Sequence, residues 1–230
     1  NEEEGYMSHA NYLVPVIMIL AGFVTLINWV ILDPFGSPLT KVINPDTLAT
    51  LQKVALPIGD ATLGIMTLLI VITIALQLSK YRQYDNPIAA ILTSVVAFFV
   101  VTPMSISVVP AGSTAAITVS GIGSGFVGSS GMFVGILVGL VATDIFIKLT
   151  NVDKFKIKID GQIPPSVISS FNVLIPIILT VFLFTVLNFV LTTGFNMTLN
   201  DLISNIITKP LSNVTTGLFG FVLITSIANL

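Results

Sequence analysis

The sequence lacks the residues from which many catalytic and metal sites are built. Its 230 residues include no cysteine, so the chain can form neither a disulfide framework nor a thiolate metal site. It has one histidine, His9, within the polar amino end NEEEGYMSHAN. Zinc sites need several ligands, so a lone histidine gives zinc chemistry almost nothing to work with. We interpret residues 1–12 as an unstructured end or one added for expression, and we expect no metal and no cofactor.

Charge is almost as scarce as cysteine. Charged residues make up 9% of the chain, the formal net charge is −2, and no basic patch with interleaved aromatic residues occurs, which excludes a nucleic-acid-binding module. By contrast, 54% of the residues are hydrophobic and the mean hydropathy is +1.01. Such a chain cannot cover itself with polar surface in water. The composition therefore indicates a protein of the lipid bilayer.

Long uncharged runs predict membrane-spanning helices. The first begins at Leu13 and continues for about 20 residues, enough at ~1.5 Å per residue to cross a hydrocarbon layer of ~30 Å. We predict an all-α polytopic membrane protein with five full spans and a truncated sixth, at 13–32, 61–79, 88–101, 132–149, 174–191 and 217–230. The chain stops within the sixth run, so we expect a natural continuation after Leu230. Residues 33–59 are predicted to be a polar link.

The interval between the third and fourth predicted spans is expected to be irregular. No charge occurs between Asp85 and Asp144, which is too long an interval for one helix, and Pro103, Pro110 and the glycine-rich GIGSGFVGSSG break it. Irregular backbone at membrane depth is stable only where protein or a water-filled cavity satisfies its polar groups. We expect residues 102–130 to lie outside the bilayer or to line a cavity. Their GSGFVG matches a dinucleotide-binding pattern, but without a βαβ context we treat the match as chance.

Two acidic residues are candidates for a polar site. Asp60 stands directly before the second predicted span, and we interpret it chiefly as a helix N-cap, with binding of a polar solute as the alternative. Asp144 lies inside the fourth predicted span, where a carboxylate is by default a functional candidate. Lys148 follows one turn later, so an i,i+4 ion pair near the membrane interface is the favoured interpretation.

Three glycines at the start of the fourth predicted span and directly before it share one helix face. Gly131, Gly135 and Gly139 are each four residues apart, which makes them a stripe without side chains. Such a stripe lets a neighbouring helix approach closely. We expect this glycine stripe to pack against another helix of the chain or across a dimer.

A lysine-rich segment is predicted to form a short extended arm at the membrane surface. Lys154, Lys156 and Lys158 alternate with apolar residues, which is typical of an extended segment with one apolar face. Lysine and arginine are more numerous on the side of this arm, so the positive-inside rule makes that side, and the amino terminus, cytoplasmic. Helical spacing in SVISSFNVL predicts a short interfacial amphipathic helix after the arm, and NMTLNDLISNIITKPL predicts a second one on the outer side.

Three nearly contiguous stretches resemble a known family: GSSGMFVGILVGLVATDIF, KFKIKIDGQ and IPPSVISSFNVLIP. Together they are similar to the membrane (IIC) component of the bacterial sugar phosphotransferase system (PTS), lactose/cellobiose/diacetylchitobiose type, most specifically over residues 128–176. The resemblance implies a homodimeric permease of the bacterial cell membrane. It would carry a disaccharide inward to a partner IIB domain, which phosphorylates the sugar from a phosphocysteine, with a IIA component as a further partner. It also implies an architectural role, turning the arm back into the membrane, for Pro164, Pro165, Ser166, Phe171 and Pro176.

The sugar site of that family lies further along the chain, with a histidine in a GIHG motif and a glutamate in an NEP motif. Neither motif is present here, so we identify no catalytic residue and expect residues 13–230 to be the scaffold and dimerisation part, without the carboxy-terminal substrate domain. Two other classes stay open. One is an assembly module that dimerises through the glycine stripe and binds no solute. The other is an ion-coupled secondary transporter that uses Asp60 or Asp144, although the sequence favours group translocation.

Overall fold

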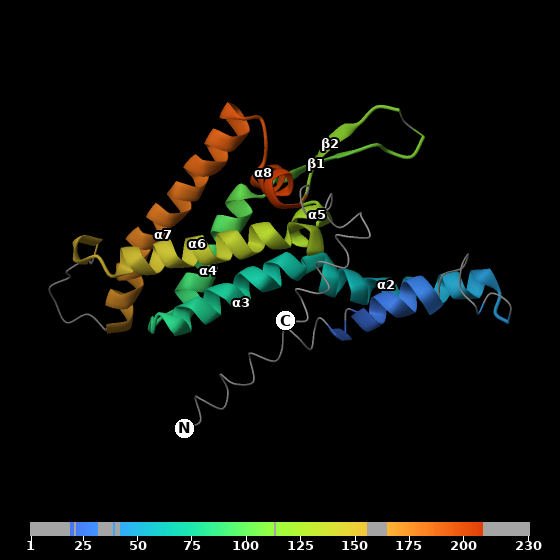
Figure 1. Ribbon diagram of the computed structural model, residues 1–230, viewed down its shortest axis with the longest axis horizontal. Coiled ribbons are helices and arrows are strands. Elements are labelled where there is room, and N and C mark those ends of the chain that lie inside the picture. Colours follow the sequence, from blue (N-terminus) through green and yellow to red (C-terminus); the bar gives the residue numbers. More distant parts are fainter. Residues whose placement is uncertain are drawn as a thin grey trace, which may run out of the picture.

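Four apolar helices form a bundle at the centre of the molecule (Figure 1). The computed structural model describes residues 19–20, 22–31, 39, 42–112, 114–155 and 165–208. Within them the bundle helices are α3 (Met66–Tyr81), α4 (Pro87–Val101), α6 (Met132–Thr150) and α7 (Pro165–Phe189). The predicted, mainly helical architecture is confirmed. The sixth predicted span, at 217–230, lies outside the described residues, and the described part of the first is helical and ends in a π-helical turn, η1 (Ile27–Ile31).

A helix that the sequence analysis did not predict precedes the bundle. Helix α2 (Pro45–Thr62) occupies most of the predicted polar link, so that prediction is wrong for residues 45–59. The Asn44 side chain accepts a hydrogen bond from the Asp46 N–H at 3.0 Å, and Pro45 fills the first turn. One 3-10 turn, η3 (Leu63–Ile65), joins α2 to α3. Asp60 therefore lies inside a helix, and its predicted role as an N-cap is wrong.

Helices α4 and α6 begin and end within one residue of their predicted bounds. Asn86 caps α4 by accepting a hydrogen bond from the Ala89 N–H at 3.2 Å. In the part of the chain that the structure describes, three helical stretches are long and apolar enough to cross a bilayer, at 46–81, 129–150 and 171–194. Helix α4 is apolar but has 15 residues, about 22 Å at ~1.5 Å per residue, so the number of spans stays a prediction.

Helix α7 is continuous over 25 residues. The predicted division into an interfacial helix and a separate span beginning at Leu174 is therefore wrong. Pro176 lies inside the helix and is buried in the bundle, and the Thr180 hydroxyl donates to its carbonyl oxygen at 2.8 Å. A π-helical turn, η6 (Val190–Gly194), ends this helix.

A short helix follows where the second amphipathic helix was predicted. Helix α8 (Leu199–Ile203) begins with a capping box between Thr198 and Asp201 and runs on into a π-helical turn, η7 (Ser204–Thr208). Leu199 and Ile203 are buried in the core of the bundle. Helix α8 is thus held by the bundle on its apolar side.

A β-hairpin lies within the region expected to be irregular, residues 102–130, and this part of the prediction is wrong. Strands β1 (Ser105–Val108) and β2 (Ile117–Ser120) pair antiparallel, with Ser105 opposite Ser120 and Val108 opposite Ile117. β-branched residues recur in both strands, which favours extended backbone. The hairpin projects away from the helices (Figure 1), and α5 (Ser124–Val127) and a 3-10 turn, η4 (Ser129–Gly131), lead back to α6.

Small and β-branched side chains dominate the core of the bundle. One cluster of buried residues joins α3, α4, α6 and α7 and includes Val71, Ala97, Phe98, Val138, Ala142 and Phe184. The buried hydroxyls of Ser94 in α4 and Thr143 in α6 share a hydrogen bond of 2.7 Å. The outward faces instead carry large exposed apolar side chains, among them Ile88, Leu92, Val96, Leu140, Val141, Phe182 and Leu183. Such faces suit lipid and would be unfavourable in water.

We predict that the Ser94–Thr143 hydrogen bond couples α4 to α6. Ser94→Ala and Thr143→Val should each lower the free energy of unfolding in detergent by about 0.5–1.5 kcal/mol. Each removes one of the two hydroxyls and leaves the other buried without its hydrogen-bond partner. The double variant should lose less than the sum of the two. Thr185→Val, which removes an exposed hydroxyl bonded within its own helix, is the control and should be nearly neutral. Strictly additive losses would contradict the coupling.

Candidate functional site

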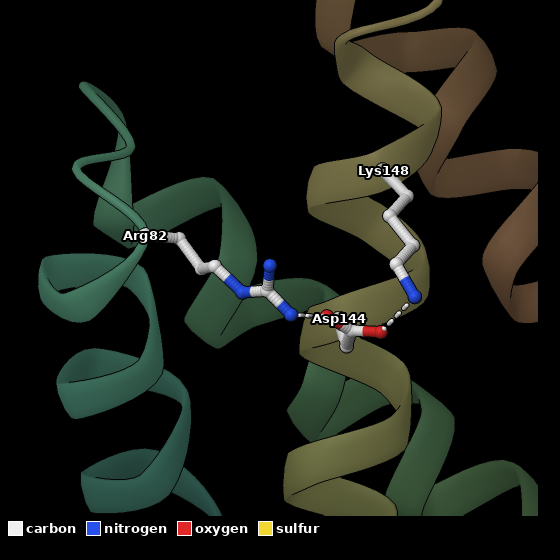
Figure 2. Close-up of polar contacts among 3 residues, drawn as sticks. All are labelled: Arg82, Asp144 and Lys148. Atoms are coloured by element: carbon white, nitrogen blue, oxygen red, sulfur yellow. Dashed lines mark hydrogen bonds and ion pairs between the residues drawn. The ribbon is translucent and has the colours of Figure 1, made fainter.

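Three charged side chains meet at one end of the bundle, and we call Arg82, Asp144 and Lys148 the charged cluster (Figure 2). Arg82 Nη2 lies 2.5 Å from Asp144 Oδ1, and Lys148 Nζ lies 2.6 Å from Asp144 Oδ2. The expected pair between Asp144 and Lys148 is therefore present. Arg82, at the end of α3, is a partner that sequence analysis missed, because it is 62 residues away in the chain.

The charged cluster lies where it can stabilise the ends of two helices. Arg82 is the C-cap residue of α3 and Lys148 lies in the last turn of α6, where positive charge is favoured by the helix dipole. A cation engages each oxygen of the Asp144 carboxylate, and the arginine reaches it from the neighbouring helix. The cluster ties α3 to α6 at this end of the bundle.

The turn between α3 and α4 closes the same end. Tyr84 packs edge-on against Phe146, with ring centroids 5.7 Å apart and an angle of 86° between the rings. Burial raises the pKa of the Tyr84 phenol above its ordinary value, a hydrogen bond with Thr150 lowers it, and the Asp85 carboxylate adds to the rise. A hollow of about 350 Å³ opens beside this turn, and its polar lining includes Asn151, which caps the end of α6, and Asn172 of α7.

The glycine stripe lies against α3. A Cβ added at Gly135 would come within 2.6 Å of Thr67 Cγ2, and one at Gly139 within 3.2 Å of Ile74 Cγ2. At Gly131 an added Cβ would overlap the backbone carbonyl of Phe126. The close approach expected from the spacing thus takes place within this chain. Because α3 covers the stripe, a helix of a second copy has no access to it.

The structure describes only some of the residues to which the family resemblance assigns an architectural role. Pro164 lies outside the described residues, as do Lys156 and Lys158 of the predicted arm, and Pro165 and Ser166 begin α7. Phe171 is 45% exposed, whereas Pro176 is fully buried. Lys154 lies in a 3-10 turn, η5 (Asp153–Phe155), so the extended arm that we predicted does not include residues 153–155.

Asp60, the other acidic candidate, lies on a cavity of about 330 Å³, which we call the polar cavity. It opens between η1, the junction of α2 with α3, and the α5–η4 segment. Asn28, which is 2% exposed, lines it too, and sequence analysis missed this residue because it is neutral and sits in an apolar run. Among the described residues no three histidine, cysteine or acidic side chains gather to hold a metal ion.

We predict that Gly135→Ala destabilises the bundle. The added methyl group would meet Thr67 at 2.6 Å, and relieving such overpacking costs about 1–3 kcal/mol of unfolding free energy. Gly22→Ala is the matched control, since its Cβ would meet nothing within 4 Å. Thermal melting of the two purified variants in the same detergent measures the difference. Equal melting temperatures would show that α3 does not rest on this stripe.

The fold is similar to that of a solved transporter. The crystal structure of the transporter ChbC, the IIC component of the N,N'-diacetylchitobiose-specific phosphotransferase system, superimposes with a TM-score of 0.73 at 24% sequence identity. The match covers 92% of this chain and 48% of that one. At this identity the likeness shows the fold alone.

Sequence relatives and a family model agree with this likeness. The cellobiose-specific PTS EIIC component of Geobacillus stearothermophilus is 32% identical over 74% of this chain and 37% of its own. The oligo-beta-mannoside-specific PTS EIIC component of Bacillus subtilis (strain 168) is 28% identical over 89% of this chain and 43% of its own. The chain thus spans less than half the length of these relatives. The family model described as "Phosphotransferase system, EIIC" matches residues 11–227, so the chain belongs to the EIIC family of the phosphotransferase system.

Proposed function

We propose that this chain is the amino-terminal scaffold part of a PTS permease that moves a disaccharide inward for phosphorylation by a partner IIB domain. The observation that carries the proposal is the family match over residues 11–227. The bundle and its lipid-suited outer faces agree with a membrane scaffold. The names of the relatives, which specify cellobiose, oligo-beta-mannosides and diacetylchitobiose, favour a β-linked sugar as the substrate.

This chain would contribute architecture to transport rather than phosphoryl-transfer chemistry. In the described residues the charged cluster engages both oxygens of Asp144, and its geometry provides no free acid or base in the bundle at that point. Phosphorylation would then depend on the IIB partner and on residues beyond this sequence. A homodimer would have to form through surfaces other than the glycine stripe, such as the exposed apolar face of α4.

The end of the bundle that bears the charged cluster is proposed to face the cytoplasm. Lys80, Arg82 and Lys148 lie at this end, which agrees with the positive-inside rule. The hairpin and the polar cavity lie at the other end of α3 (Figure 1) and would then face outward. The IIB partner would accordingly meet the α3–α4 turn and the start of α7.

Sugar uptake tests the proposed function. Cells that express the gene encoding this chain together with IIA and IIB components should accumulate radiolabelled cellobiose as its phosphate ester. Accumulation should stop when the phosphocysteine-forming residue of IIB is replaced, because the phosphoryl group then has no donor. If the cells instead accumulate free sugar, and an ionophore abolishes that accumulation, the protein is an ion-coupled transporter and the proposal is wrong.

The lack of cysteine makes the proposed orientation directly testable. Gln83→Cys, in the exposed α3–α4 turn, and Thr114→Cys, in the exposed hairpin loop, each introduce a single thiol. An impermeant maleimide added to intact cells should label the hairpin thiol and not the turn thiol, and both should react after the cells are opened. The reverse pattern would invert the topology.

A further inference from the structure

One residue that lines the polar cavity has a buried oxygen atom without a hydrogen-bond partner. Asn28 is 2% exposed, and its Oδ1 is, among the described side chains, the buried polar atom that has no hydrogen-bond partner. An unpaired acceptor in a buried site is unfavourable and is rare in folded proteins. Asn28 also lines the cavity, so a turn of its amide group that brings the buried Oδ1 to the cavity would let a bound molecule supply the missing donor.

The backbone around the polar cavity departs from regular helix on each side. Asn28 lies in the π-helical turn η1, and such turns are frequent at functional sites. Across the cavity, the 3-10 turn η3 interrupts the long helix formed by α2 and α3. Gly128 closes the site without a side chain, since an added Cβ would lie 2.7 Å from the Ser124 carbonyl oxygen and 3.1 Å from that of Leu63. The cavity walls are thus built by close backbone contact.

The described residues that line the cavity are rich in oxygen atoms and include no lysine, arginine or histidine. The polar side chains among them are those of Thr25, Asn28, Asp60, Ser124, Ser129 and Ser130. A carboxylate, an amide oxygen and hydroxyl groups together accept hydrogen bonds from a neutral ligand that carries several O–H donors. A bare cation would also suit oxygen ligands, but a cavity of about 330 Å³ is roughly ten times the ~30 Å³ that one water occupies. It falls instead in the range of small-molecule sites.

We propose that the polar cavity is a saccharide subsite, in which sugar hydroxyls donate to the Asp60 carboxylate and, once the Asn28 amide turns toward the cavity, to its oxygen. The inference rests on the proposed function and extends it. The cavity lies at the end of α3 opposite the charged cluster, so it would be the place where an external sugar first binds the scaffold.

Binding to the purified chain in nanodiscs tests the proposal. Titration calorimetry with cellobiose should give a saturable isotherm. Asn28→Leu should weaken binding at least about tenfold, the effect of losing a hydrogen bond to a buried group, and Asp60→Asn should weaken it as well. The melting temperature of Asn28→Leu without sugar should stay the same or rise, because the unpaired oxygen is gone. Asn188→Leu, the same change in α7 away from the cavity, should leave binding unchanged.

Three results would overturn the proposal. They are no saturable binding of cellobiose, equal cellobiose affinity in the wild type and Asn28→Leu, or a saturable calorimetric signal when sodium chloride is titrated without sugar.

Uptake experiments in cells separate this inference from the proposed function. If Asn28→Leu raises the external cellobiose concentration for half-maximal uptake about tenfold, while uptake at saturating sugar is kept, the subsite is supported. If phosphorylated sugar accumulates with unchanged half-saturation, the subsite is wrong and the permease function stands. If wild-type cells accumulate only free sugar, the function fails whatever the cavity binds.

Discussion

The close approach of α6 to α3 is the constraint on which the other parts of the bundle depend. Gly131, Gly135 and Gly139 leave no side chain between the helices, and the Thr67 hydroxyl donates across the contact to the Gly128 carbonyl at 2.5 Å. In a bilayer, burial of apolar surface between helices gains little, so dispersion contacts at this short range and interhelical hydrogen bonds have to hold the pair together. Any side chain on the stripe would separate them.

The same contact positions groups far from the glycines. With α6 seated on α3, Asp144 comes within reach of Arg82 at one end, while α5 and η4 come to lie beside η3 at the other. The lateral neighbour α4 then presents Ser94 to Thr143. One helix face without side chains thus sets the geometry of both the charged cluster and the polar cavity.

The sequence predicted those elements whose ends carry local signals. Asn86 and Pro87 mark the start of α4, and the glycine-rich stretch before Met132 marks the start of α6, so both helices were placed within a residue. The start of α2 carries a similar Asn-Pro signal at Asn44, but we interpreted residues 33–59 as a polar link. We placed a boundary at Leu174, yet α7 continues as one helix through the buried Pro176. The hairpin was missed because its strands are only four residues each.

Site residues that depend on tertiary contacts could not be found this way. The pairing of Asp144 with Lys148 follows from spacing along one helix, whereas its pairing with Arg82 needs the packing of α3 on α6. Asp60 was noticed because it is charged, but the sequence gives no sign that it shares a cavity with Asn28. An asparagine in an apolar run becomes informative only when the three-dimensional structure shows that its buried oxygen has no hydrogen-bond partner.

The hairpin also indicates where the chain can accept inserted residues. Its two strands pair with each other and its tip lies away from the bundle, with Gly112 in a left-handed conformation at φ 83°. Lengthening a loop held in this way adds only a closure entropy that grows logarithmically with its length. Insertions at this tip would therefore leave the helices undisturbed, so a foreign epitope could be placed there without disturbing the bundle.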